Sequence, residues 1–69
     1  MHVLIDSCGF VLSRHRSALA AQESDVRLQR AVRRANGPNA YLMTAVYEVT
    51  GKIKSGRLER NEGRFVCSL

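Results

Sequence analysis

Five residues within the first fifteen positions have side chains that could do covalent chemistry: His2, Asp6, Ser7, Cys8 and His15. A nucleophile needs a base and an orienting group within hydrogen-bond reach, and nearness in sequence does not supply that geometry. The chain also lacks a Gly-x-Ser-x-Gly elbow and a glycine-rich phosphate loop. We therefore expect that the protein is not an enzyme and has no cofactor.

Cysteine and histidine side chains are also the usual ligands of structural zinc. Cys8, Cys67, His2 and His15 lack the paired short spacings of a structural zinc site, so we expect no metal. One cysteine pair this far apart in sequence does not make a disulfide framework. We expect two reduced, buried thiols; the alternative is a disulfide between neighbouring first and last strands.

The strongest chemical signal is positive charge. Eleven Lys and Arg residues against six Asp and Glu give a formal net charge of +5 in only 69 residues, and nine of the eleven are arginine. Arginine makes bidentate contacts with phosphate and carboxylate groups. The expected partner is therefore anionic: an acidic or nucleic-acid-bound protein complex, or DNA or RNA itself.

Two groups of basic residues are candidate partner-binding sites. Arg27, Arg30 and Arg34 follow an i, i+3, i+7 spacing that puts them on one face of a helix, with Arg33 beside them. An ordinary solvated helix face is the alternative interpretation, but only Glu23 and Asp25 are acids nearby. The second group lies around two expected turns and consists of Lys52, Lys54, Arg57, Arg60 and Arg64. For the lysines, the alternative role is protection of an edge strand against aggregation.

The elements that must position these residues fit one domain spanning residues 1–69, because a chain this short cannot support two cores. Two apolar runs separated by Asp, Ser and Gly predict a hairpin within residues 2–13, a bent strand with a bulge being the alternative. Residues 14–36 have helical composition, with an apolar stripe at Leu28, Ala31, Val32 and Ala35 and a stop at residues 36–38. Either Ser17 or Ser24 could cap the start.

Residues 40–69 return to β character. Alternation from Tyr41 to Thr50 predicts a long strand, residues 52–59 a polar strand, and residues 64–69 a last strand with Phe65, Cys67 and Leu69 on one face. We expect at least one of Tyr41 and Tyr47 to be in the core. The predicted fold is α+β, in the approximate order ββαβββ, with one helix packed on a small, largely antiparallel sheet.

The segments TAVYEVTGK at residues 44–52 and GRFVC at residues 63–67 resemble small phage-encoded anti-CRISPR proteins of type I systems. The resemblance covers about the C-terminal half of the chain and concerns its layout. It implies a compact helix-on-sheet protein that occupies the DNA-binding surface of a CRISPR surveillance complex through Lys and Arg side chains. Many members are acidic DNA mimics, whereas this chain is basic, so steric blockage beside a nucleic-acid channel is the mechanism that fits.

The functional expectation is a small basic inhibitor of phage or mobile-element origin that docks on a nucleic-acid-handling protein complex. The alternative is direct, sequence-nonspecific binding of nucleic acid. No stretch approaches the length of a membrane-spanning helix, and Asp6 ends the first apolar run, so we expect no membrane role and a cytoplasmic protein in the host cell. The sequence is compatible with a monomer or a homodimer.

Overall fold

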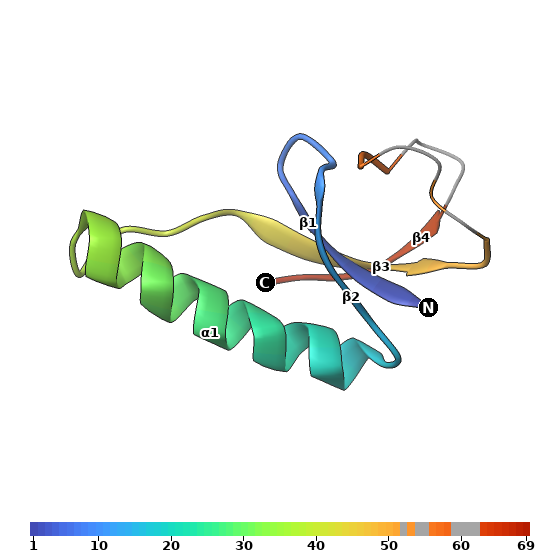
Figure 1. Cartoon of the computed structure of the whole chain (residues 1–69), viewed down its shortest axis with the longest axis horizontal. Helices are drawn as coiled ribbons and strands as arrows, with labels where there is room; N and C mark the ends of the chain where they lie inside the picture. The colour runs from blue at the N-terminus through green and yellow to red at the C-terminus, as the bar shows by residue number, and fades with distance from the viewer. Residues whose placement is uncertain (52, 54–55, 59–62) are drawn as a thin grey trace.

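A computed structural model of the chain describes residues 1–51, 53, 56–58 and 63–69. Its elements are β1 (His2–Asp6), β2 (Val11–His15), α1 (Ala18–Asn36), β3 (Thr44–Val49) and β4 (Gly63–Ser68). The four strands form one antiparallel sheet in the order β2-β1-β3-β4. Figure 1 shows α1 lying along one side of this sheet. The predicted α+β fold is confirmed.

The β1–β2 hairpin is also confirmed, and its turn has a clear local cause. The Asp6 carboxylate accepts hydrogen bonds from the backbone N–H groups of Cys8 and Phe10, at 2.9 and 3.0 Å. Gly9 has a φ of 87°, which a residue with a side chain adopts only with strain. The aspartate and the glycine together close the chain into the turn.

Helix α1 begins at the earlier of the two predicted caps. The Ser17 hydroxyl accepts a hydrogen bond from the Ala20 N–H at 3.1 Å, which satisfies one of the free donors of the first turn. At the other end, Gly37 has a φ of 111° and its N–H bonds the Arg33 carbonyl, with Arg33 and Arg34 in the last turn. The predicted C-terminal end is therefore confirmed.

The buried side of α1 differs from the predicted apolar stripe. Ala31 and Ala35 are exposed and Leu28 and Val32 are half-buried, whereas Ala21, Asp25 and Gln29 are the buried residues. Two polar side chains can occupy this side because each finds hydrogen-bond partners there. The helix is thus rotated about its axis relative to the prediction.

Asp25 and Gln29 form a buried network that ties α1 to the chain leading into β3. The Asp25 carboxylate accepts hydrogen bonds from the Thr44 hydroxyl at 2.7 Å and from the Gln29 amide at 3.1 Å. The Gln29 side chain also bonds both backbone groups of Leu42, donating to its carbonyl and accepting from its N–H. These bonds hold Leu42 against α1, outside the sheet. The long strand predicted from Tyr41 is therefore limited to Thr44–Val49.

The sheet has a small apolar cluster on each face because alternate strand residues point to opposite sides. On the helix side, Leu4 and Val46 pack with Ala21, and Cys67 and Leu69 lie against them. On the open face, Val3, Ile5 and Val49 form a second cluster; the half-buried residues against it are Val11, Ala45, Tyr47, Ile53 and Leu58. Tyr47 thus packs against a core cluster, as predicted for at least one tyrosine, while Tyr41 is exposed.

Strand β4 contains a register shift that the sequence pattern did not predict. Cys67 pairs with Val46 and Phe65 pairs with Tyr47, which leaves Val66 as an extra residue. Because of this bulge, Cys67 lies on the helix side while Phe65 contacts the Tyr47 ring edge-to-face on the open side. The prediction that Phe65 and Cys67 share a face is wrong.

The polar strand predicted at residues 52–59 lies mostly outside the described residues. Within the part that the structure describes, Arg57 forms an isolated antiparallel bridge with Phe10, and Ile53 and Leu58 pack on the open face. Both cysteines are free thiols, but the prediction that both are buried is wrong for Cys8, which the turn exposes. Cys67 is half-buried.

Substitution of Asp25 by Ala should lower the free energy of unfolding by about 1–3 kcal/mol, because the buried Thr44 hydroxyl loses its acceptor. Urea unfolding of the purified protein measures the change. Glu23→Ala is the matched control, since Glu23 is an exposed acid on the same helix, and it should stay within about 0.5 kcal/mol of the wild type. Equal effects of the two substitutions would contradict a structural role for the Asp25 network.

Candidate partner-binding surface

The C-terminal half of α1 carries four exposed arginines, which we call the arginine face: Arg27, Arg30, Arg33 and Arg34. None of the four guanidinium groups makes a hydrogen bond or ion pair with another described residue. An unpaired guanidinium group keeps all of its N–H donors available for an anionic group. The four side chains are therefore available to a partner.

The buried network of Asp25 and Gln29 determines which side of α1 faces solvent. A helix advances one turn in 3.6 residues, so residues two and nine positions after Asp25 lie nearly opposite it. Those positions are Arg27 and Arg34, while Gln29 follows Asp25 on the inner side. Fixing Asp25 and Gln29 against the sheet fixes the arginines outward.

The acidic side chains of α1 neutralise little of the positive charge of the arginine face. Of the two acids on α1, Asp25 is only 7% exposed and its carboxylate bonds Gln29 and Thr44. Glu23 is the other acid, and it is exposed. The outer side of the helix consequently presents four guanidinium groups and one carboxylate.

Two apolar side chains accompany the arginines on the surface of α1. Leu19 is 64% exposed and Val26 is 54% exposed. Val26 lies four and seven residues before Arg30 and Arg33, so the three positions are neighbours along one side of the helix. Helical period alone does not identify Leu19 and Val26 as surface residues, because it cannot distinguish a single exposed apolar residue from a core residue.

The second predicted group of basic residues is only partly described, since Lys52, Lys54 and Arg60 lie outside the described residues. Arg57 donates from Nε to the Cys8 carbonyl at 2.9 Å and lies over the Phe10 ring, beside the β1–β2 turn. Arg64 pairs with Glu48. In Figure 1 the C-terminal end of α1 and the start of β4 lie at opposite ends of the molecule, so Arg64 is separate from the arginine face.

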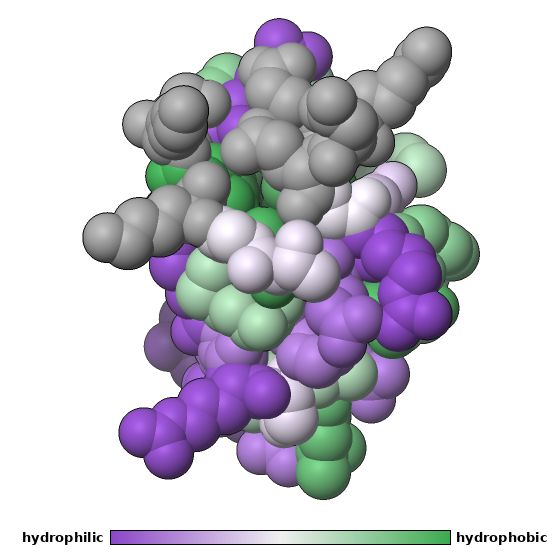
Figure 2. Space-filling view, turned by 90° about the vertical axis from the view of Figure 1, so that its right-hand side faces the viewer, coloured by the Kyte–Doolittle hydropathy of each residue, from purple (hydrophilic) through white to green (hydrophobic). Residues whose placement is uncertain are grey.

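Two further arginines, outside both predicted groups of basic residues, lie where β2 leads into α1. Arg14 and Arg16, with Met1 and His15, line a shallow depression of about 720 Å³. Figure 2 views the molecule from the end that carries the N-terminus and this connection, and shows hydrophilic and apolar side chains interspersed there. Positive charge is thus found at both ends of α1.

Arg64 belongs to a row of polar residues that crosses all four strands at one end of the sheet. The strand register aligns His15, His2, Glu48 and Arg64. Arg64 Nη2 lies 2.7 Å from Glu48 Oε1, and His2 Nε2 lies 3.7 Å from Glu48 Oε2. The hydrogen bond from Arg64, and then its charge, lower the pKa of the Glu48 carboxyl below its ordinary value.

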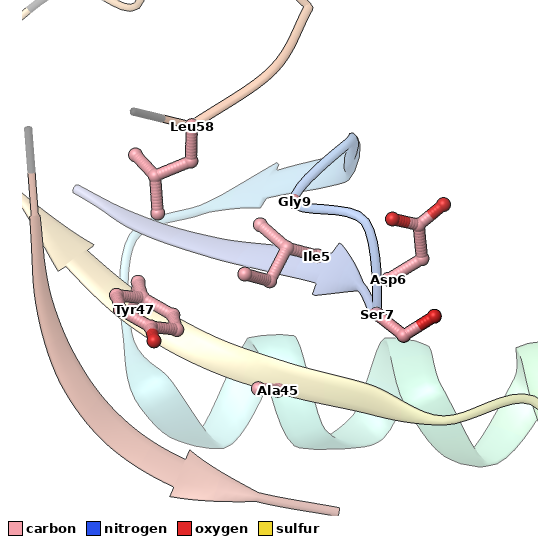
Figure 3. A pocket seen from close by; sticks show the side chains of 7 residues that line it. All are labelled: Ile5, Asp6, Ser7, Gly9, Ala45, Tyr47 and Leu58. Atoms are coloured by element: carbon pink, nitrogen blue, oxygen red, sulfur yellow. The ribbon is translucent and has the colours of Figure 1, made fainter. Parts of the chain in front are cut away.

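The open face of the sheet has a pocket of about 410 Å³. Figure 3 shows Ile5, Ala45 and Tyr47 along the strands, with Leu58 at one end and Asp6 and Ser7 at the other. Gly9 of the same turn lies beside Leu58, whose N–H bonds the Gly9 carbonyl at 2.7 Å. One Asp6 oxygen is already occupied by the N–H groups of the turn. The pocket therefore has an apolar floor, and the second Asp6 oxygen and the hydroxyls of Ser7 and Tyr47 are polar groups of its lining.

The five residues whose side chains could do covalent chemistry do not all come together in the fold. Asp6, Ser7 and Cys8 lie at the turn of the hairpin, whereas His2 and His15 lie at its open end. Four residues of extended chain span about 13 Å at roughly 3.3 Å each, far beyond hydrogen-bond reach. No group of three or more His, Cys, Asp or Glu in the described part of the chain could hold a metal ion.

No protein-family model, curated protein or solved structure matches this chain. Among the described residues, no helix is both long enough and apolar enough to cross a membrane.

Substitution of Arg64 by Gln should reduce the loss of stability that occurs when the pH is lowered. Arg64 lowers the pKa of Glu48 in the folded protein, so the pair contributes stability above the ordinary glutamate pKa of about 4.3 and loses it as the pH falls through the lowered value. Urea unfolding at about pH 6 and about pH 3 measures this loss, which should be smaller in the variant.

Arg16→Gln is the control for this measurement, because it removes one positive charge without removing a partner of Glu48. An Arg64→Gln protein with the same pH dependence as the wild type and Arg16→Gln would contradict the role of the ion pair.

Proposed function

We propose that this chain is a small basic binding protein that docks through the arginine face of α1 on an anionic surface of a nucleic-acid-handling protein complex. The observation that carries the proposal is the set of four exposed guanidinium groups, unpaired within the described residues, with Glu23 as the single exposed acid on α1. Arginine is the side chain best suited to paired contacts with carboxylates and phosphates.

Exposed apolar residues beside the arginines favour a protein partner over bare nucleic acid. Phosphate contacts are made by charged and polar groups and need no aliphatic surface. Protein interfaces, in contrast, combine arginine with buried apolar side chains at their centre. Val26, one turn before Arg30, and Leu19, seven residues before Val26 on the same side of α1, supply that apolar surface.

The kind of complex follows from the sequence resemblance. A surveillance complex of a type I CRISPR system carries bound nucleic acid beside its protein surfaces, and the resemblance implies an inhibitor of phage or mobile-element origin. A basic protein docked at the edge of the DNA-binding channel would exclude the target DNA sterically. Such a complex works in the host cytoplasm, which is the compartment we propose for this chain.

The second candidate function is direct, sequence-nonspecific binding of nucleic acid. The observation that favours it is the presence of Arg14 and Arg16 near one end of α1 and of the arginine face near the other. A helix of 19 residues is about 28 Å long, so these charges could contact several successive phosphates.

Reversal of charge on the arginine face tests the leading function. The triple variant Arg27→Glu, Arg30→Glu and Arg34→Glu should lose inhibition of target-duplex binding by a purified type I surveillance complex, by roughly tenfold or more in the concentration needed. The control is the double variant Arg14→Glu, Arg16→Glu, which is compared with the double variant Arg27→Glu, Arg30→Glu because each reverses the charge of two exposed arginines. Full inhibition by the variants of the arginine face would overturn the proposed surface.

A salt titration with labelled duplex DNA alone tests the second candidate. Neutralisation of about three to five phosphates predicts a slope of log affinity against log salt of roughly −3 to −4. Electrophoretic titration at a low and a moderate salt concentration measures the slope. Absence of binding at the low concentration would exclude direct nucleic-acid binding.

A further inference from the structure

We propose that the partner segment seated on α1 is an acidic amphipathic helix, whose apolar side chains cover Leu19 and Val26 and whose carboxylates pair with Arg30 and Arg33. The inference rests on the proposed function, because it names the kind of segment that the arginine face would bind.

Five residues of α1 are spaced so that they form one stripe along the helix. Leu19, Val26 and Arg33 are separated by seven residues each, and Glu23 and Arg30 lie four residues after Leu19 and Val26. Residues at i, i+4, i+7, i+11 and i+14 form a single stripe along a helix. A stripe that repeats every seven residues is the surface on which a second helix packs side by side.

The position of this stripe in the fold leaves room for such a neighbour. Helix α1 packs on β1, β2 and β3, and the Gln22 amide reaches Cys67 Sγ of β4 at 3.5 Å. Leu19 and Val26 lie three residues before and four residues after Gln22, so they continue round the helix on the side of β4. Both stay exposed there, at 64% and 54%.

Charge complementarity identifies the partner as acidic. The stripe carries two arginines towards the C-terminal end of α1 and one glutamate nearer its start, and α1 has no other exposed acid. A partner with carboxylates opposite Arg30 and Arg33 pairs with both cations. A cationic or purely apolar helix would leave the arginines unpaired.

The charges also give a direction to the partner helix. Acidic residues are favourable near the N-terminus of a helix, where the helix dipole is positive. An antiparallel partner places its N-terminal turn beside Arg33, at the C-terminal end of α1. Its apolar residues one heptad apart then lie beside Leu19 and Val26, which are about 10 Å apart along the axis.

The experiment uses two fluorescently labelled synthetic peptides and the whole protein. The first peptide is a helix with leucines in heptad positions and glutamates beside them, and the second is an all-glutamate peptide of equal length. Fluorescence anisotropy measures the binding of each to the wild type, to Leu19→Ser with Val26→Ser, and to Arg30→Glu with Arg33→Glu. Leu12→Ser is the control, since Leu12 is an exposed apolar residue on β2.

The expected result is that the amphipathic peptide binds the wild type and the Leu12→Ser protein equally. The Leu19 and Val26 substitutions should lower the affinity for this peptide by roughly tenfold or more, while the affinity for the all-glutamate peptide stays within about twofold. The Arg30 and Arg33 substitutions should weaken both peptides. All substituted side chains are exposed, so folding is expected to be retained and is checked by circular dichroism.

The outcomes separate this inference from the proposed function. Equal binding of the amphipathic peptide by the wild type and the Leu19 and Val26 variant, or no binding of that peptide at all, would overturn the acidic-helix inference. In either case, loss of binding of the all-glutamate peptide on charge reversal at Arg30 and Arg33 would still support the arginine face as a binding surface. If charge reversal at Arg30 and Arg33 changed neither peptide, the proposed function would fail together with the inference.

Discussion

The hydrogen bonds of Asp25 and Gln29 are the constraint on which the surface of this protein depends. They attach the inner side of α1 to Leu42 and Thr44, and thereby fix the rotation of the helix about its own axis. An apolar contact surface alone tolerates some rotation, because burial of apolar area has no direction, whereas these hydrogen bonds form at one rotation only. The outward direction of the arginines is a consequence of that rotation.

The small size of the chain explains why polar residues occupy the inner side of α1. Adjacent residues of β1 supply both core clusters, Val3 and Ile5 to the open face and Leu4 to the helix side. Because apolar residues are buried on both faces of the sheet, a chain this short has few of them for each face. Farther along α1, where it faces the chain before β3, satisfied polar groups take the place of apolar packing.

Local signals in the sequence were sufficient to predict the hairpin, the helix and its end at Gly37, because each depends on residues close to one another. They were not sufficient for the inner side of α1, since Asp25 and Gln29 become core residues only through partners far along the chain. The shift at Val66 was missed for a similar reason: a bulge depends on pairing between strands. The outward direction of Arg27, Arg30 and Arg34 was predicted from spacing, but their apolar neighbours Leu19 and Val26 could be identified only from the structure.

The edges of the sheet bear on where this protein can associate. In both edge strands the register shift leaves one extra residue, Leu12 in β2 and Val66 in β4. A bulge interrupts the regular row of backbone donors and acceptors and twists the edge, which works against pairing with the edge of a second chain. Helix α1 has no such interruption and presents its charged and apolar side chains in regular order. The bulged edges are therefore poorly suited to extension of the sheet, in contrast to the docking through side chains of α1 that we propose.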